Sequence, residues 1–304
     1  MNKLIRAIKS PKRILIFILN KSARLFSDKQ FLKMKFHIEM GQKLDLDNPK
    51  TFNEKLQWLK LYNRKLGYTR MVDKYAVKDF VANIIGKEHI IPTLGVWNSV
   101  DEIDWDSLPS QFVLKTTHGG GGGGVVICKD KMRMNRQDAC NKLQRSLKSD
   151  IYLSYREWPY KNVPKRILAE KYMVDESGIE LKDYKFFCFD GEVKCFKVDF
   201  DRFISHKANY YDRDAKLLPF WEVAFPADHT RVFKKPENFE KMIELAETLS
   251  KDIPFVRIDF YNINGNIYFG EMTFFPAAGM GKFNPNEWDD ILGDWLELPR
   301  NKTI

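Results

Sequence analysis

The sequence predicts an α+β protein of two lobes with antiparallel sheets, preceded by a helical N-terminal region. Asp190-Gly191 and Asn264-Gly265 each separate two short apolar segments, and such dipeptides supply the positive φ angles of type I′ hairpin turns. Glycines 119–124 are a third signal, because they lie between two segments that also have the composition of strands. Helices and strands do not alternate as βαβ units, so we do not expect a parallel sheet.

The helices are predicted from caps and apolar spacing. Thr51 and Glu54 form a capping box before apolar residues at helical spacing, which predicts a helix over residues 48–66. A second helix is expected over residues 71–83. The later elements are expected to be strands at 90–96, 112–116 and 125–128, a helix at 135–149, strands at 167–172, 184–189 and 192–198, a helix at 238–250, and strands at 255–261 and 266–272.

The chain is long enough for two lobes. It has 304 residues and is 44% hydrophobic, which supplies enough apolar material for a substantial core. No linker rich in Pro, Gly or Ser divides it, so we expect the lobes to meet near residues 169–173. The predicted parts are a basic arm with further helices over 1–70, a lid lobe with the glycine run over 71–170, and a C-terminal lobe over 171–304.

Positive charge is concentrated at the N-terminus. Residues 1–43 hold 11 Lys and Arg against 2 Asp and Glu, and 11 − 2 = +9 equals the net charge of the whole chain. Residues 44–304 therefore balance to zero. A body without a basic field does not favour binding to nucleic acid, which depends on neutralising many phosphates.

The N-terminal arm also carries an apolar run at residues 14–19. Six apolar residues are too few to cross a bilayer, which takes about 20, and the run lacks the cleavage site of a signal peptide. Two interpretations stay open: an amphipathic helix packed on the body with a solvated basic face, or a peripheral anchor on an anionic inner leaflet. The four cysteines lack zinc spacing and indicate a reducing compartment, so we expect a cytoplasmic protein, with peripheral contact at the inner membrane face as the second option.

The strongest functional signal is Lys115 followed, after Thr-Thr-His118, by six consecutive glycines. Glycine lets backbone N–H groups approach an anion closely, and a nearby lysine adds a point charge for phosphate. No Gly-Lys-Ser/Thr closes the run as in a P-loop, and a strand follows it where a dinucleotide fingerprint would have a helix. A flexible linker is disfavoured, because the run is short and lies between strands. The run therefore predicts a flap that closes over phosphates.

Two carboxylates and an arginine lie on the C-terminal hairpin. Asp259 and Glu271, beside Arg257, offer the hard oxygen ligands that Mg²⁺ prefers, although a solvated strand face is the alternative. A two-residue turn at Asn264-Gly265 would pair residue 259 with 270 and turn the carboxylates to opposite sides. A turn of odd length would put them on one face, so the metal hypothesis requires the odd turn.

A third feature is weak when taken alone. Glu170-Lys171-Tyr172-Met173 ends a predicted strand, and Asp183-Tyr184-Lys185 opens the first hairpin. A strand that ends in Glu-Lys lies more often on the protein surface than in a functional site. In this order, however, the three features resemble the ATP-grasp superfamily, which implies a fold of two α+β lobes that enclose a nucleotide between antiparallel sheets.

The resemblance is more specific in three segments. Residues 49–58, 73–78 and 183–186 are similar to the TupA-like ATP-grasp family, and the likeness covers roughly residues 45–285. That family is associated with teichuronopeptide, capsule and exopolysaccharide biosynthesis. The resemblance implies an ATP- and Mg²⁺-dependent ligase that activates a carboxylate as an acyl phosphate and joins it to an amine. A saccharide or small-molecule carboxylate and an amine or amino acid are the implied substrates, and neither their identity nor the oligomeric state follows from the sequence.

The resemblance also implies roles for single residues. The ATP phosphates would be held by Lys74, Lys115, Lys185, His118 and the amides of Gly119, Gly120, Gly121 and Gly122. Adenine would be bound near Glu170, Lys171 and Met173, and ribose by Asp183. Asp259, Glu271 and Thr273 would hold the metal, Arg257 would stabilise the oxyanion, and Arg202 would clamp the substrate carboxylate.

Several alternatives remain open. Thr273 stands where the superfamily usually has Asn, so one or two metals are both compatible with the sequence, and the helical N-terminus stands where many relatives have a βαβ domain. His118 would equally suit a solvated loop, and Arg202 a charged strand end. Asp199-x-Asp201 would fit a nucleotide-sugar metal motif, since some family members are labelled glycosyltransferases. A membrane-attached assembly protein and a kinase acting on an alcohol are further alternatives.

Overall fold

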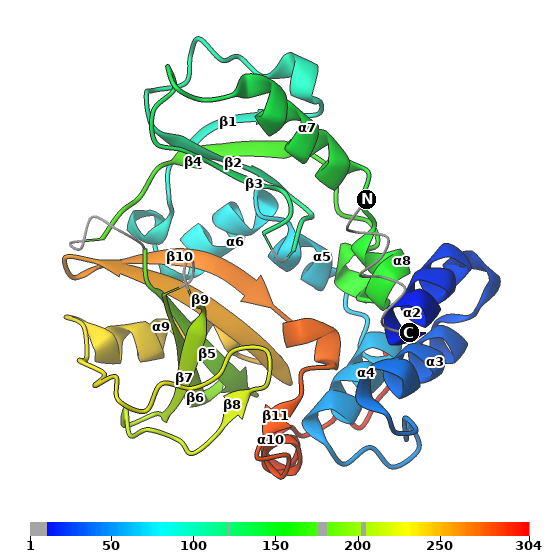
Figure 1. Ribbon diagram of the computed structural model, residues 1–304. Coiled ribbons are helices and arrows are strands. Elements are labelled where there is room, and N and C mark those ends of the chain that lie inside the picture. Colours follow the sequence, from blue (N-terminus) through cyan, green and yellow to red (C-terminus); the bar gives the residue numbers. More distant parts are fainter. Residues whose placement is uncertain (1–10, 121, 176–180, 202–204, 304) are drawn as a thin grey trace.

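The computed structural model describes residues 11–120, 122–175, 181–201 and 205–303. Two antiparallel sheets lie one above the other, and the N-terminal helices lie to one side of them (Figure 1). We call the four-stranded sheet the lid sheet and the five-stranded sheet the palm sheet. This arrangement confirms the predicted mixed α+β architecture with antiparallel pairing.

The lid sheet has the strand order β1-β4-β2-β3. Its strands are β1 (Thr93–Trp97), β2 (Phe112–Thr116), β3 (Val125–Cys128) and β4 (Ile167–Lys171). Helix α7 (Arg136–Leu147) packs against β2 and β3, and its Leu143 joins Phe112 and Leu114 in a small core of its own. The glycine run leaves β2 and returns into β3, as predicted from the sequence.

The palm sheet has the strand order β10-β9-β5-β6-β7. Its strands are β5 (Asp183–Phe189), β6 (Glu192–Phe200), β7 (Lys207–Asp212), β9 (Phe255–Ile263) and β10 (Asn266–Thr273). Side chains alternate between its faces. Phe186, paired with Ile258, packs on Phe239 of helix α9 (Phe239–Ser250), whereas the neighbouring pair Lys185 and Asp259 lies on the opposite face. One face is therefore the apolar core and the other is free to carry charge.

The N-terminal helices attach to the palm sheet. Helix α4 (Phe52–Tyr62) begins at the predicted capping box of Thr51 and Glu54, and the ring of Phe52 packs edge-on against Phe255 at 4.9 Å. The other helices and short strands are α2 (Pro11–Lys21), α3 (Asp28–Met40), α5 (Gly67–Val72), α6 (Ala76–Ile85), α8 (Ile151–Tyr155), β8 (Trp221–Glu222), β11 (Phe283–Asn284) and α10 (Trp288–Trp295). Within the described ranges, no helix combines the length and apolar character that crossing a bilayer requires. The lobe boundaries proposed above stay a prediction.

The single helix predicted over residues 71–83 is wrong, because Asp73 interrupts it. Helix α5 ends at Val72, and Asp73 has extended backbone angles (φ −72°, ψ 112°). Its Oδ1 accepts hydrogen bonds from the N–H groups of Tyr75 at 2.9 Å and Ala76 at 3.3 Å, which caps the start of α6. Its Oδ2 accepts from Arg166 Nη2 at 2.7 Å. The break sets Lys74 apart from both helices.

Both predicted hairpins form with positive φ angles in their turns. Asp190 and Gly191 have φ of 47° and 84°, and Asn264 and Gly265 have φ of 51° and 79°. Asn266 pairs with Ile263, so the second turn has two residues and the expected odd-length turn is wrong.

A β-bulge at Gly270, and not the turn, places the two carboxylates on one face of the sheet. The register shifts at Gly270, so that Glu271 pairs with Asp259 and Thr273 with Arg257. A side chain at position 270 would bring its Cβ to 3.1 Å from the carbonyl oxygen of Asp259, which favours glycine there. The two carboxylates therefore share one face of the palm sheet, as the metal hypothesis requires.

Candidate active site

The lid sheet carries a positive cluster, the lid cluster, made of Lys78, Lys115 and Glu170. β2 and β4 are neighbouring strands, and Lys78 reaches them from α6. Glu170 Oε1 lies 2.5 Å from Lys78 Nζ, and its Oε2 lies 2.5 Å from Lys115 Nζ. Burial raises the pKa of Glu170, but the two lysines outweigh burial and lower the pKa below its ordinary value. Two cations and one anion leave a charge of +1, which suits an anionic ligand.

The opposing palm face carries the palm cluster, made of Asp183, Lys185, Asp199, Arg257, Asp259 and Glu271. Lys185 Nζ lies 2.7 Å from Asp183, 3.1 Å from Asp259 and 3.4 Å from Asp199. Strands β5, β6 and β9 are neighbours, so their alternate side chains meet on this face. The two cations and four carboxylates of this cluster give a net charge of 2 − 4 = −2, which suits the binding of a cation.

Arg257 holds the two predicted metal carboxylates together. Its Nε lies 2.6 Å from Asp259 Oδ1, and its Nη2 lies 2.7 Å from Asp259 Oδ2, 2.9 Å from Glu271 Oε1 and 3.1 Å from Thr273 Oγ1. Burial lowers the pKa of Arg257, but Asp259 and Glu271 outweigh burial and raise it, so the guanidinium stays charged. Its Nη1 donates to no residue that the structure describes, which leaves a donor for a ligand.

The donors on this face fit a magnesium-bound nucleotide. Asp259, Glu271 and Thr273 present two carboxylates and one hydroxyl on one face. Across the described ranges, no group of three or more His, Cys, Asp or Glu residues stands ready to enclose a metal. Mg²⁺ commonly takes only one or two carboxylates and completes its shell with phosphates and water. Burial raises the pKa of Glu271, but Lys74 and Arg257 outweigh burial and lower it to about 2, so this ligand is ionised.

Lys74 joins the lid to the palm. Its backbone N–H donates to Thr117 O at 3.0 Å, and its Nζ donates to Gly119 O at 2.6 Å. The same Nζ lies 3.7 Å from Glu271 Oε2. Burial lowers the pKa of Lys74. The first glycine of the run and the second predicted metal carboxylate therefore meet at one lysine.

The ends of the glycine run are packed tightly. A Cβ at Gly119 would collide with Thr116 Oγ1, and one at Gly124 with Thr116 Oγ1 and Ser146 Oγ, two hydroxyls that share a hydrogen bond of 2.7 Å. His118 is only 3% exposed, and its Nε2 lies 3.1 Å from the carbonyl oxygen of Ser146. The alternative of a solvated loop histidine is therefore wrong, and burial lowers the pKa of His118.

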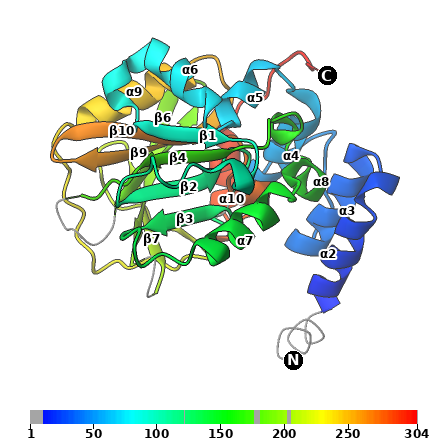
Figure 2. The same ribbon diagram turned by 90° about the horizontal axis from the view of Figure 1, so that it is seen from above.

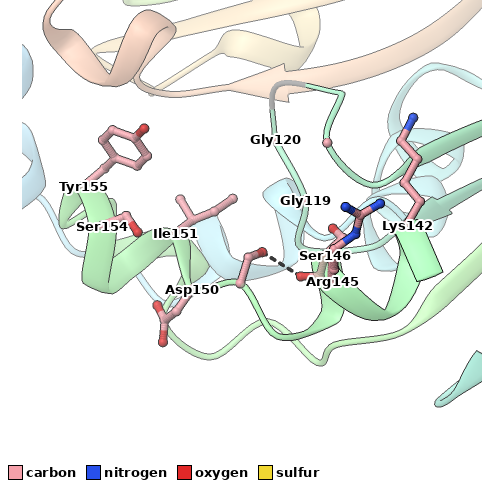
Figure 3. A pocket seen from close by; sticks show the side chains of 11 residues that line it. Gly119, Gly120, Lys142, Arg145, Ser146, Asp150, Ile151, Ser154 and Tyr155 are labelled. Atoms are coloured by element: carbon pink, nitrogen blue, oxygen red, sulfur yellow. Dashed lines mark hydrogen bonds between the residues drawn. The ribbon is translucent and has the colours of Figure 1, made fainter. Parts of the chain in front are cut away.

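A hollow of about 520 Å³ lies beside the start of the glycine run (Figure 3). Lys142 and Arg145 of α7 border it on one side, and Ile151, Ser154 and Tyr155 of α8 border it on the other. Gly119 borders this hollow and also accepts the hydrogen bond from Lys74 Nζ. The hollow thus offers two cations, hydroxyls and one aromatic ring next to the predicted phosphate site.

The remaining predicted residues are placed as follows. Lys171 is exposed at the end of β4, Met173 is half-buried just after it, Asp183 is buried at the start of β5, and Gly122 is exposed with φ of 73°. Gly121 and Arg202 lie outside the described residues. The roles given to all these residues stay predictions.

Asp199 and Asp201 have different surroundings. Asp199 is buried in the palm face, where Lys185, Lys197 and His206 lie within 3.4, 3.6 and 2.9 Å of its oxygens. Asp201 is half-buried, and its Oδ2 lies 2.5 Å from Arg231 Nη2. The two carboxylates do not offer the shared metal site that a nucleotide-sugar motif requires.

Sequence reasoning missed two parts of the site. Lys78 lies in the segment 73–78 that is similar to the TupA-like family, and this likeness was its available signal. Lys197 lies across from Lys185 on β6 and 3.3 Å from Glu222 Oε1, which also accepts from the hydroxyl of Tyr210 at 2.5 Å. No local pattern links Glu222 to this face, because β8 is a two-residue strand of a different sheet.

The two sheets and the charged face between lid and palm define an ATP-grasp protein. Residues 54–297 match the TupA-like ATPgrasp family, and the chain belongs to that family. Among curated proteins, none matches the sequence.

Several solved structures are similar to this chain, each at a TM-score below 0.5. The D-alanine-D-alanine ligase of Helicobacter pylori is 14% identical, with 82% of this chain and 70% of that chain covered and a TM-score of 0.42. The D-alanine-D-alanine ligase of Bacillus anthracis in complex with ATP is 14% identical, with 74% and 63% covered and a TM-score of 0.42. The ATP-grasp ligase PsnB, complexed with a phosphomimetic variant of its minimal precursor, Mg and ADP, is 10% identical, with 90% and 70% covered and a TM-score of 0.43. These likenesses concern the fold alone.

Proposed function

We propose that this protein is an ATP-dependent carboxylate–amine ligase that forms an amide through an acyl phosphate. One observation carries the proposal: Lys74 bonds the first glycine of the flap and lies 3.7 Å from Glu271, so phosphate donors and metal carboxylates serve one site. A nucleotide with bound Mg²⁺ needs both kinds of group at once.

The lid would hold the nucleotide. Lys74, Lys115 and the flap amides bind the ATP phosphates, and Lys78 keeps Glu170 in place beside Lys115. Asp183 lies near the ribose and Lys185 near the phosphates. Mg²⁺, held by Asp259 and Glu271, supplies neutralisation of the charge that develops on the phosphates.

The palm would serve the acyl transfer. A substrate carboxylate attacks the γ-phosphorus and ADP leaves. The amine then attacks the acyl carbon, and inorganic phosphate leaves. Arg257 stabilises the oxyanion of that second step through Nη1, the guanidinium nitrogen that donates to no described residue. The hollow beside Gly119 suits the carboxylate substrate, because Lys142 and Arg145 favour an anion and Tyr155 suits the ring of a saccharide.

Membership of the TupA-like family supports a role in making a cell-surface polysaccharide, such as capsule, exopolysaccharide or teichuronopeptide. The four cysteines are free thiols, which together with the use of ATP supports a cytoplasmic location.

The test is ADP release in the presence of uronic acids and amino acids, one candidate pair at a time. We expect one carboxylate to stimulate release with Mg²⁺ present, and hydroxylamine to trap its acyl phosphate as a hydroxamate. Stimulation without any hydroxamate would instead indicate transfer to an alcohol. Calorimetric binding of a UDP-sugar with no binding of ATP would overturn the ligase in favour of a glycosyltransferase.

A further inference from the structure

Helix α2 has an apolar face that the body leaves uncovered. Ile14, Phe17 and Ile18 are 40%, 62% and 56% exposed, and Leu15 and Leu25 are 52% and 81% exposed. Positions 14, 17 and 18 follow helical spacing and form one stripe on α2, in which Lys21 also lies, and the exposed Leu25 follows in the short 3-10 helix Ala23–Leu25. Figure 2 shows α2 at the periphery of the molecule, away from both sheets. Clustered exposed apolar residues of this size mark an interaction surface.

The opposite face of α2 already supplies the contacts with the body. Leu19 and Ala23 are buried and form a small core with Phe31 of α3. The helix therefore has two apolar faces, and folding uses only one of them. The stripe around Phe17 is not needed for packing on α3.

Buried polar contacts fix which face points outward. Lys35 Nζ of α3 donates to Asn20 Oδ1 at 3.1 Å, and Arg156 Nη2 donates to Ala23 O at 2.5 Å. Asp28 at the start of α3 lies 2.6 Å from Arg64 Nη2. Turning the apolar stripe inward would break the contacts of Lys35 with Asn20 and of Arg156 with Ala23, and each buried cation would lose one of its hydrogen bonds, which is unfavourable.

The N-terminal segment of the sequence that contains the stripe is positively charged. Residues 1–27 contain no Asp or Glu, and their seven basic residues are Lys3, Arg6, Lys9, Lys12, Arg13, Lys21 and Arg24. The whole chain has a net charge of +9, so residues 28–304 carry a net charge of 9 − 7 = +2. Lys12 alone of the described basic side chains on α2 has an acidic partner, Glu39 at 2.9 Å.

We propose that the outer face of α2 docks on an anionic lipid bilayer, with the helix lying in the plane of the interface. Its apolar stripe would enter the headgroup–acyl boundary, and the surrounding basic residues would contact anionic headgroups. A second copy of the chain is a poorer occupant, because it would bring two such positive segments together. This proposal does not depend on the reaction catalysed, since α2 contributes nothing to the lid or palm cluster.

The test is sedimentation of the full-length protein with vesicles of phosphatidylcholine alone or mixed with phosphatidylglycerol. We expect binding only to the mixed vesicles, weakened at high salt because exposed charges are then screened. The double variant Phe17→Ser/Ile18→Ser should lose binding about tenfold or more, since it removes two large apolar side chains. The double variant Leu66→Ser/Val232→Ser is the matched control, because both residues are 83% exposed and lie elsewhere; it should bind like the wild type.

Further measurements distinguish membrane docking from misfolding of the variant and from dimer formation. An unchanged melting temperature would show that Phe17→Ser/Ile18→Ser folds, and Arg13→Glu/Arg24→Glu should abolish the preference for phosphatidylglycerol. Equal binding to both vesicle types, or wild-type binding by the serine variant, would overturn the proposal. A dimer in light scattering that Phe17→Ser/Ile18→Ser dissociates, without vesicle binding, would assign the face to a second copy instead.

Discussion

The lid and palm clusters are built with opposite charge ratios. In the lid, one carboxylate, Glu170, lies between two lysines. In the palm, one lysine, Lys185, lies among three carboxylates, and Arg257 bridges one of these to Glu271. Each cluster is mostly neutralised by its own partners, which limits the penalty of burying charge, and each keeps a small excess of one sign.

Under the proposed function, the difference between the two clusters divides the binding of an Mg²⁺–nucleotide complex between two sheets. The positive excess of the lid suits phosphate oxygens, and the negative excess of the palm suits the cation that those oxygens also bind. Lys74 lies where the two meet. The comparison therefore predicts that palm substitutions change metal dependence and turnover, and that lid substitutions change nucleotide affinity.

The largest effect is expected for Asp259→Asn. Loss of this carboxylate should reduce Mg²⁺-dependent ADP release by about 10³-fold, the equivalent of the several kcal/mol that metal-ion stabilisation provides. ADP release is measured against Mg²⁺ concentration, with Asp201→Asn as the control because Asp201 lies outside the palm cluster and pairs with Arg231. Unchanged activation by Mg²⁺ would remove the palm from the metal site.

Arg257→Ala sharpens the comparison within the palm. We expect turnover to fall by about 10²–10³-fold, as for removal of one oxyanion donor, while ATP affinity stays nearly intact. Steady-state kinetics and calorimetric ATP binding separate the two. Much weaker ATP binding with unchanged kcat would show that Arg257 serves the nucleotide and not the acyl step.

Lys115→Met tests the lid. Removing one charge-assisted contact to phosphate should weaken ATP binding by about 10- to 100-fold. Glu170 keeps Lys78 as its partner, so the fold should persist. Lys129→Met is the control, because Lys129 is exposed just beyond β3. ATP affinity equal to wild type would contradict a phosphate role for the lid cluster.

The smallest effect is expected for the stability of Glu170→Gln. Gln keeps one hydrogen-bond acceptor. The free energy of unfolding at neutral pH should therefore fall by about 1.5 kcal/mol, the lower end for a hydrogen bond to a charged group. Because the folded pKa of Glu170 is lowered from 4.5, its stabilisation is present above pH 4.5 and is lost as the pH falls through the lowered value. The stability gap between wild type and variant should therefore narrow below pH 4.5.

Urea unfolding at neutral pH and at several pH values below 4.5 measures the difference in free energy of unfolding between the wild type and Glu170→Gln. Glu287→Gln is the control, since Glu287 is exposed and away from both clusters. A gap for Glu170→Gln that widens on acidification would mean that the lysines do not hold Glu170 ionised.

Much of the fold was predictable because its signals are local. The turns at Asp190-Gly191 and Asn264-Gly265, the capping box at Thr51 and the strands around the glycine run all depend on backbone preferences of a few adjacent residues. The lysine and carboxylate types of the candidate site were also visible, because few other side chains serve phosphate and magnesium.

The predictions from the sequence were wrong at Asp73 and Gly270, because each residue is compatible with two local structures. Asp73 suits a helix only weakly and caps one well, and the contact with Arg166 adds a second partner for the capping conformation. Gly270 looks like any strand glycine in the sequence. The bulge there, not the turn, sets the register of β10 on β9.

The sequence by itself determined the kinds of chemical group available and the places where the chain turns, since both depend on residue identity and short-range sterics. Only the tertiary structure decided which charges neutralise one another: that Glu170 takes Lys78 from another element, that Lys185 lies among carboxylates of three strands, and that Lys74 reaches both sheets. Such pairings join residues up to 197 positions apart, in the case of Lys74 and Glu271 (271 − 74 = 197), and only packing brings them within contact distance.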